Sequence, residues 1–177
     1  FLYSMIFNTV GKRTLIQAPM QIDGAGSICI GAYTNIARGA WLMGNSDREK
    51  ITLKIGNYDQ IGHLCHIVAW EEVIIEDSVL IADKVYISDC THSYQDISEP
   101  VYKQDIKVLS CVRIGEGSWI GENVVIIGAK IGKHCIIGAN SVVNYDIPDY
   151  CVAVGAPAKV IKRYDRDANV WIKIEGK

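Results

Sequence analysis

Aromatic residues and long hydrophobic runs are both scarce in this sequence of 177 residues. Phe, Trp and Tyr make up only 8% of the chain, whereas hydrophobic residues as a whole make up 49%. Any core must therefore be built mostly from Ile and Val. The apolar start at residues 1–7, FLYSMIF, is too short to span a membrane and lacks the basic flank and cleavage site of a signal peptide. We expect one domain with a sizeable core and no integral membrane segment.

The chain also lacks a basic run and any low-complexity segment. Its formal net charge is -2 and its pI is about 6.1. Nucleic acids and anionic membranes attract proteins through basic patches. Neither is therefore an expected partner.

No two of the six cysteines have the C-x-x-C spacing that zinc sites and redox motifs use. The cysteines are Cys29, Cys65, Cys90, Cys111, Cys135 and Cys151. We expect them to be reduced and structural, with no bound metal. Reduced cysteines predict a cytoplasmic location.

What the sequence does contain is an aliphatic residue at every sixth position over much of its length. The series are Ile30, Ile36 and Leu42; Ile55, Ile61 and Ile67; Ile75, Ile81 and Ile87; Ile114, Ile120 and Ile126; and Ile131, Ile137 and Val143. The next residue is often Gly or Ala, which would permit a tight backbone turn. The fourth residue after the aliphatic is small or branched, and Cys65 and Cys135 occupy this inward position.

A period of six fits neither a helix nor a half-buried strand, and it indicates a chain that turns a corner every six residues. Three such faces make a coil of about 18 residues, with strands about 4.8 Å apart in successive coils. The sequence thus predicts an all-β fold, a parallel β-helix of hexapeptide repeats.

The rhythm is interrupted in two places and ends before the C-terminus. We predict a lead-in at residues 1–21, the β-helix at 22–148 with excursions at 45–54 and 88–111, and a short C-terminal tail at 149–177. One step, from Ile126 to Ile131, is five residues long. Because Pro148 cannot continue a central ladder, the repeat should end there. The longer excursion, expected to lack regular structure, is the segment most expected to carry function.

Three motifs connect this pattern to a known family. They are Thr91-His92-Ser93 in the long excursion, Ile114–Gly121 (IGEGSWIG) and Val154–Ile161 (VGAPAKVI). Together with the repeats, over residues 22–163, the chain resembles the left-handed β-helix acyltransferases, in the branch of maltose and galactoside O-acetyltransferases. Its loop and tail lengths look more like those of bacterial surface-polysaccharide O-acetyltransferases.

The resemblance implies a left-handed helix, acetyl-CoA as acyl donor without a covalent enzyme intermediate, and a carbohydrate acceptor. It also implies a homotrimer whose active sites lie between subunits. By this resemblance His92 is the catalytic general base. Trp119, which precedes inward Ile120 and should point outward, would form a wall of the CoA or acceptor cleft. A backbone N–H that the sequence does not identify would stabilise the oxyanion.

Further residues are assigned by the same resemblance. Gly121, Glu122, Gly138 and Ala139 would line the CoA arm, and Lys159 and Lys162 would approach its phosphates. Asn144 and Tyr145 stand in the same region, where many relatives have Thr-Lys, and Glu122 replaces a small residue. His66 and Asp89 are candidates for acceptor binding, His66 from an outer corner and Asp89 from the long excursion.

Three alternatives remain open at this stage. The first is N-acetylation of an amino or nucleotide sugar, because one base can serve either nucleophile. The second is a metal-dependent enzyme like the γ-type carbonic anhydrases, which would need His63, His66 and His92 around zinc. The third is a non-catalytic scaffold.

Overall fold

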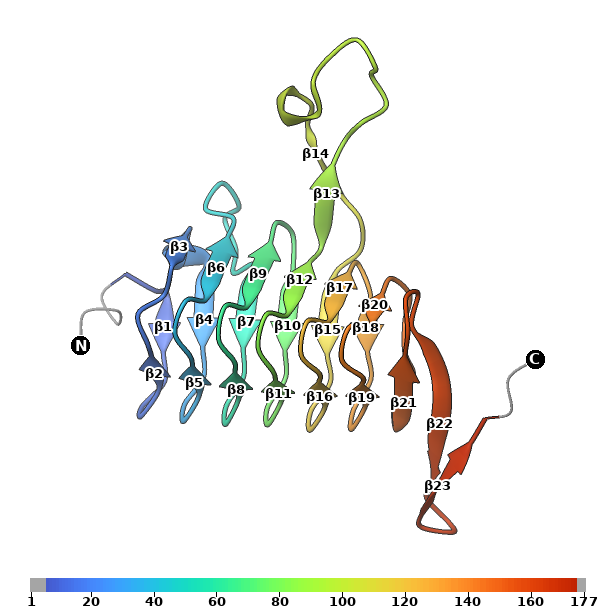
Figure 1. The fold of residues 1–177 in the computed structure, drawn as a ribbon. Helices are drawn as coiled ribbons and strands as arrows, with labels where there is room; N and C mark the ends of the chain where they lie inside the picture. Colours follow the sequence, from blue (N-terminus) through green and yellow to red (C-terminus); the bar gives the residue numbers. More distant parts are fainter. Residues whose placement is uncertain (1–5, 175–177) are drawn as a thin grey trace.

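The computed structural model describes residues 6–174 and shows a parallel β-helix whose coils stack along one axis (Figure 1). The first sheet contains β1 (Thr9–Val10), β4 (Ile28–Ile30), β7 (Leu53–Ile55), β10 (Val73–Ile75), β15 (Val112–Ile114) and β18 (Lys130–Ile131). The second begins with β2 (Leu15–Ile16), β5 (Asn35–Ile36), β8 (Gln60–Ile61), β11 (Leu80–Ile81), β16 (Trp119–Ile120), β19 (Ile136–Ile137) and β21 (Cys151–Val154). The third contains β3 (Gln21–Asp23), β6 (Trp41–Gly44), β9 (His66–Ala69), β12 (Tyr86–Ser88), β17 (Val125–Ile127) and β20 (Val142–Val143).

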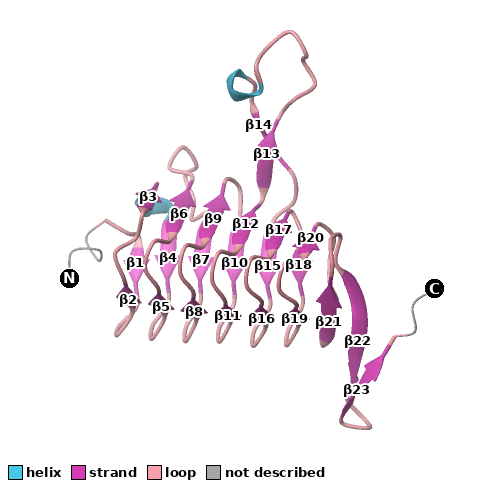
Figure 2. Cartoon of the chain, viewed as in Figure 1, coloured by secondary structure: helices cyan, strands magenta, loops and turns pink. Residues whose placement is uncertain are grey.

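Four further strands complete the fold. The antiparallel pair β13 (Cys90–His92) and β14 (Ile106–Val108) forms a hairpin, and β22 (Lys159–Asp165) and β23 (Val170–Lys173) extend the second sheet in antiparallel fashion. Two 3-10 helices, Ala25–Ser27 and Val101–Lys103, are the remaining regular elements of the described chain. Figure 2 shows that strands and loops account for nearly all of it. No helix in residues 6–174 has the length and apolar character needed to cross a membrane.

The six-residue period places one aliphatic side chain of every face inside the coil. Ile55, Ile75 and Ile114 are paired in register on successive strands of the first sheet, and all three are buried. The twelve largest fully buried side chains are ten Ile and two Leu, and each stabilises the fold by roughly 1.5–3 kcal/mol when buried. The predicted aliphatic core and parallel β-helix are confirmed.

The role expected for the glycines that follow the aliphatics was wrong. Gly31 and Gly56 do not have the positive φ of a left-handed turn, whereas Tyr33 and Tyr58, two residues further on, do. A Cβ added at Gly31 would overlap the carbonyl of Gly56 in the next coil. Glycine is therefore needed here because backbones of adjacent coils approach closely, and the turn itself is made by other residues.

The β-helix also extends beyond the predicted limits at both ends. The first coil is formed by β1, β2 and β3, which pair in parallel with β4, β5 and β6, so it begins at Thr9 and not at residue 22. Val10, Ile16 and Ile22 continue the six-residue step backwards, which is why this segment folds as a coil. At the other end, β21 pairs in parallel with β19, and this pairing lies within the predicted tail.

Both excursions leave the helix at the corner between the third and first sheets. The shorter one is residues 45–52, because Leu53 and Lys54 belong to β7. The longer one is not without regular structure: β13 and β14 pair, and the Gln104 side chain bonds the backbone of Asp96 and Glu99. The five-residue step turns at Gly128, which has a φ of 55°.

Candidate active site

His92 lies at the end of β13, on the hairpin that projects away from the body of the helix (Figure 1). It is paired with Ile106 across the hairpin, and the next backbone N–H, that of Ser93, donates to the Asp105 carbonyl over 2.9 Å. The His92 side chain is exposed and makes no hydrogen bond to any residue that the structure describes. The backbone pairing therefore holds the position of an imidazole that is open to a substrate.

Asp89 anchors the base of this hairpin and does not face a substrate, so its predicted role in acceptor binding is wrong. The residue is fully buried, and its carboxylate accepts the backbone N–H groups of Trp70, Glu71 and Glu72 at 2.8, 2.6 and 2.6 Å. Its own carbonyl accepts the N–H of Leu109 from the returning strand. The carboxylate ties two corner loops together through three charge-assisted hydrogen bonds, and its burial keeps it from a substrate.

Trp119 points outward from β16, as predicted, with 49% of its surface exposed. Its neighbours on the outer face of the second sheet are Leu80 on one side and Ile136 on the other. The hairpin with His92 leaves the corner between the third and first sheets, which is opposite the second sheet in a three-sided helix (Figure 1). Within one chain, His92 and Trp119 are thus on opposite sides of the molecule.

The residues expected to line the CoA arm gather at the corner between the second and third sheets. A Cβ at Gly121 would lie 2.6 Å from the backbone nitrogen of Ala139, and one at Gly138 would lie 2.7 Å from the Val154 side chain. The coils are therefore in close contact at this corner. Only residues without a bulky side chain fit at Gly121 and Gly138.

Glu122, the unusual acidic residue at this corner, forms an ion pair with Lys84 at 3.0 Å. The pair is exposed, and the carboxylate raises the pKa of Lys84. Sequence reasoning missed this partner because the hairpin separates the two residues by 38 positions. The positive charge of Lys84 compensates the negative charge of Glu122, which by itself would repel an anionic cofactor.

Trp119 is aligned with one of the predicted lysines along the outer face of the second sheet. The register runs from Trp119 to Ile136, from Ile136 to Val152, and from Val152 to Lys162. Three strand spacings separate Trp119 from Lys162, or about 14 Å. Lys159 begins the same strand, β22, opposite Val154. The structure brings these residues onto one face.

Asn144 and Tyr145 follow β20 at the C-terminal end of the helix, and both are exposed. The Tyr145 hydroxyl donates to the Ala158 carbonyl, which connects this loop to the turn before β22. The tyrosine thereby positions the segment that carries Lys159.

His66 lies on the outer face of the third sheet rather than at a corner. Its ring stacks on Trp41 with centroids 4.1 Å apart, and Tyr86 contacts it edge-on at 5.2 Å. Burial lowers the pKa of His66, and its Nε2 has no hydrogen-bond partner among the described residues. The His66 ring is thus held between two aromatic side chains.

The metal alternative would require histidines to converge. His63 contacts Asp83, with 3.2 Å between Nδ1 and Oδ1. Within residues 6–174, no three His, Cys, Asp or Glu side chains are grouped closely enough to hold a metal ion.

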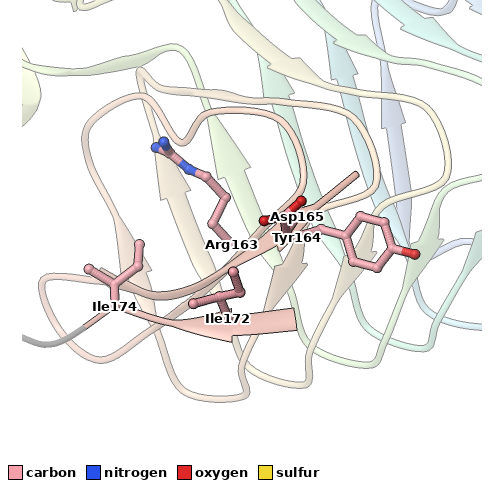
Figure 3. Close-up of a pocket in the computed structure, with 5 residues that line it drawn as sticks. All are labelled: Arg163, Tyr164, Asp165, Ile172 and Ile174. Atoms are coloured by element: carbon pink, nitrogen blue, oxygen red, sulfur yellow. The ribbon is translucent and has the colours of Figure 1, made fainter. Parts of the chain in front are cut away.

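A cavity of 630 Å³ lies on the C-terminal hairpin, away from His92 (Figure 3). Arg163 on β22 faces Ile172 on β23 across the pair, and Ile174 lies beside them. Tyr164 points away from Arg163 in this view and packs edge-on against Trp171. The hollow is mainly apolar and belongs to the strand extension rather than to the coils.

A three-sided β-helix of six-residue steps, with an exposed histidine on the β13–β14 hairpin, is the architecture of the hexapeptide-repeat acyltransferases. Residues 111–145 match the family model described as bacterial transferase hexapeptide (six repeats). The chain is 36% identical over 166 residues to WbbJ of Escherichia coli (strain K12), a protein named as a putative lipopolysaccharide biosynthesis O-acetyl transferase, covering 90% of this chain and 83% of that protein. The chain belongs to this family of acyltransferases.

Two other relatives are similar over different extents. The galactoside O-acetyltransferase of Escherichia coli (strain K12) is 30% identical over 163 residues, which cover 88% of this chain and 76% of that enzyme. A Mycobacterium tuberculosis protein named as a probable acetyltransferase, Rv3034c, is 44% identical over 112 residues. That match covers 63% of this chain and 37% of the mycobacterial protein, so the chain spans little more than a third of that relative.

Solved structures share the fold. The N-acyltransferase AntD from Bacillus cereus superposes with a TM-score of 0.77 at 22% identity, covering 94% of this chain and 90% of AntD. The hexapeptide-repeat acetyltransferase VCA0836 from Vibrio cholerae gives a TM-score of 0.62 at 24% identity, covering 93% of this chain and 78% of that chain. The fold is the left-handed β-helix that the family resemblance implied.

Proposed function

We propose that this enzyme transfers the acetyl group of acetyl-CoA to a hydroxyl of a carbohydrate, with His92 as general base. The observation that carries the proposal is the exposed imidazole of His92, held by backbone pairing on a hairpin anchored through Asp89. The relatives that cover most of this chain are named O-acetyltransferases of lipopolysaccharide biosynthesis and of galactosides. A surface-polysaccharide sugar is accordingly the acceptor class we favour.

In the reaction, His92 accepts the proton of the acceptor hydroxyl as the oxygen attacks the thioester carbon. The tetrahedral intermediate then collapses, its carbon–sulfur bond breaks, and the proton passes from the imidazolium to the departing CoA sulfur. The products are the acetyl ester and free CoA, and the histidine returns to its neutral form. A backbone N–H near the thioester would stabilise the oxyanion.

The donor would lie along the outer face of the second sheet. Trp119 provides an exposed aromatic wall, and Lys159 and Lys162 supply positive charge for the CoA phosphates about 14 Å further along. Gly121 and Ala139 have no bulky side chains, so the extended pantetheine arm of CoA would have room to pass along the adjacent corner. Lys84 offsets the charge of Glu122 at the same corner.

The site would be completed by a second copy of the chain. His92 and Trp119 lie on opposite sides of one molecule, so a hydroxyl next to the histidine cannot reach a thioester on the second sheet of the same chain. A homotrimer places the hairpin of one subunit over the second sheet of its neighbour and repeats this three times.

All six cysteines are free thiols, which supports a reducing, cytoplasmic setting for the reaction.

The test is CoA release measured with acetyl-CoA and a panel of sugars, nucleotide sugars, amino sugars and oligosaccharide fragments. We expect turnover with a hydroxyl acceptor, and His92→Ala should lower kcat by about 10²–10⁴ without loss of folding. His63→Ala removes another exposed histidine and serves as the matched control.

Each contrary outcome has a definite meaning. Turnover restricted to amino sugars would show the acceptor to be an amine. An equal loss of turnover in His63→Ala and His92→Ala, together with bound zinc, would favour the metal-dependent alternative. Near-normal turnover by His92→Ala would remove the proposed base.

A further inference from the structure

The corner between the first and second sheets carries an aromatic column unrelated to the hairpin. Tyr33 and Tyr58 stack with centroids 5.0 Å apart and planes 5° from parallel, and His134 and Tyr150 stack at 5.7 Å and 11°. All four residues have a positive φ, between 49° and 60°. Because every coil repeats the same backbone turn, each ring projects from an equivalent position and lies across the helix axis.

Cations cover the outer face of each pair. Lys12 and Arg13 lie 5.7 Å from the Tyr33 ring centroid, and Arg166 lies 5.4 Å from that of Tyr150. The other face of the Tyr58 ring and the other face of the His134 ring, here called the inner faces, point toward each other along the column. Neither inner face has a ring or cation contact within the part of the chain that the structure describes.

The two coils between these inner faces have no ring at the equivalent position. Ser78 and Gly117 stand there, with φ of 61° and 68°. His134 leans over Gly117, since a Cβ on that glycine would be 2.5 Å from the His134 Nδ1. The coils of Tyr58 and His134 are three strand spacings apart, about 14 Å. Because His134 covers Gly117, the open slot between the two rings is at Ser78.

Polar groups line the slot on the side of the first sheet. Ser78 makes no side-chain hydrogen bond within residues 6–174, and the neighbouring Asp77 carboxylate accepts the Asn57 side-chain amide. A hollow of 420 Å³ opens beside it, lined by Glu76, Asp77, Glu116 and Lys133 among others. Lys133 pairs with Glu116 at 3.5 Å and Arg113 pairs with Glu76, which leaves Asp77 as the rim carboxylate without a cation partner among the described residues.

We propose that this slot binds one pyranose ring of a neutral glycan, as a subsite separate from the transfer reaction. A pyranose presents flat C–H faces, which pack on exposed aromatic rings such as Tyr58, 59% exposed. Its hydroxyls, which lie around the ring edge, meet the Ser78 hydroxyl and the Asp77 carboxylate. The negative charge of Asp77 disfavours phosphate, so a glycan chain fits the slot better than a nucleotide sugar does.

The decisive variant is Ser78→Tyr, which continues the column and fills the slot. Tyr33 and Tyr58 already adopt the same φ, at 58° and 60°, so a tyrosine at position 78 is compatible with the fold. Tyr58→Ala removes one wall instead. As the matched control, Tyr102→Ala removes a tyrosine that is 77% exposed on the hairpin.

Binding is measured without CoA, by saturation-transfer NMR and titration, using maltohexaose, cellohexaose, chitohexaose and a galactan hexasaccharide. We expect at least one to bind the wild type, and both Ser78→Tyr and Tyr58→Ala to weaken that binding about tenfold or more. Transfer to a monosaccharide should be unchanged in Ser78→Tyr, because the slot is on a different corner from His92.

Unaltered glycan binding by Ser78→Tyr would overturn the proposal, as would a loss confined to Tyr102→Ala or no binding by any of the four oligosaccharides. Because this assay needs no turnover, its failure is distinguishable from failure of the acetyl-transfer proposal.

Discussion

Asp59 is a charged residue in an interior position that other coils fill with small or apolar residues. It follows Tyr58 in the position where the next coils have Val79 and Ser118. The carboxyl is fully buried, one oxygen accepts the Val79 N–H at 2.8 Å, and the other has no partner among the described residues. Burial raises the pKa of Asp59 to about 7.

This pKa predicts a pH-dependent stability. The folded state binds more protons than the unfolded state between about pH 4 and pH 7, so stability falls as the pH rises across that interval. Asp59→Asn mimics the protonated carboxyl and removes this dependence. We expect the variant to match the wild type only at or below about pH 4, and its advantage in unfolding free energy to grow by about 2–3 kcal/mol between pH 5 and pH 8.

Urea unfolding at the two pH values checks this expectation. Asp167→Asn, at an exposed carboxylate in the turn between β22 and β23, is the control. A difference between Asp59→Asn and the wild type that does not vary with pH would contradict the assigned titration.

At the scale of the elements, the spacing between coils decides which residues fit the corners. Strands of successive coils pair in register, and this brings the backbone of one corner against the next. Gly31 faces the Gly56 carbonyl directly, whereas Gly26, in the 3-10 helix, has nothing within 4 Å of an added Cβ. A side chain is therefore excluded by the neighbouring coil at Gly31 but meets no steric obstacle at Gly26.

We expect Gly31→Ala to destabilise the protein by about 1–3 kcal/mol, because its methyl group forces two coils apart. Gly26→Ala should change the unfolding free energy by only a few tenths of a kcal/mol. Thermal or denaturant unfolding of the two variants in parallel tests the comparison. Equal stability of both variants would show that the corner relaxes without cost.

At the scale of the whole molecule, the proposed site requires two copies of the chain. The hairpin and the second sheet are on opposite sides of the three-sided helix, a consequence of the order in which the faces follow one another. A trimer in which neighbouring subunits share each site predicts complementation between variants that are each impaired alone.

Co-expression of differently tagged His92→Ala and Trp119→Ala chains provides that test. If His92 and Trp119 come from neighbouring subunits, random mixing leaves about one quarter of the sites with both residues intact. Purified mixed trimers should then release CoA faster than either variant, measured at limiting acetyl-CoA. If both residues came from one subunit, no mixed trimer would exceed the better parent.

Much of the fold was predictable from the period alone. Trp119 points outward, and Cys65 and Cys135 lie inside, as expected. The direction of each side chain depends only on its position within the six-residue step. The first coil was missed although Val10 and Ile16 keep that step, since a single repeat of polar character is difficult to distinguish from a lead-in.

The sequence by itself determined the β-helix, its aliphatic core and the position of His92 on the longest interruption, because these depend on local repetition and on where it breaks. The tertiary structure decided which distant groups meet. Asp89 bonds amides 17 to 19 positions earlier, and Lys84 reaches Glu122 over 38 positions. Residues that contact each other lie on neighbouring coils. Because insertions change the number of residues in a coil, the sequence separation of such partners varies and cannot be predicted from the six-residue period.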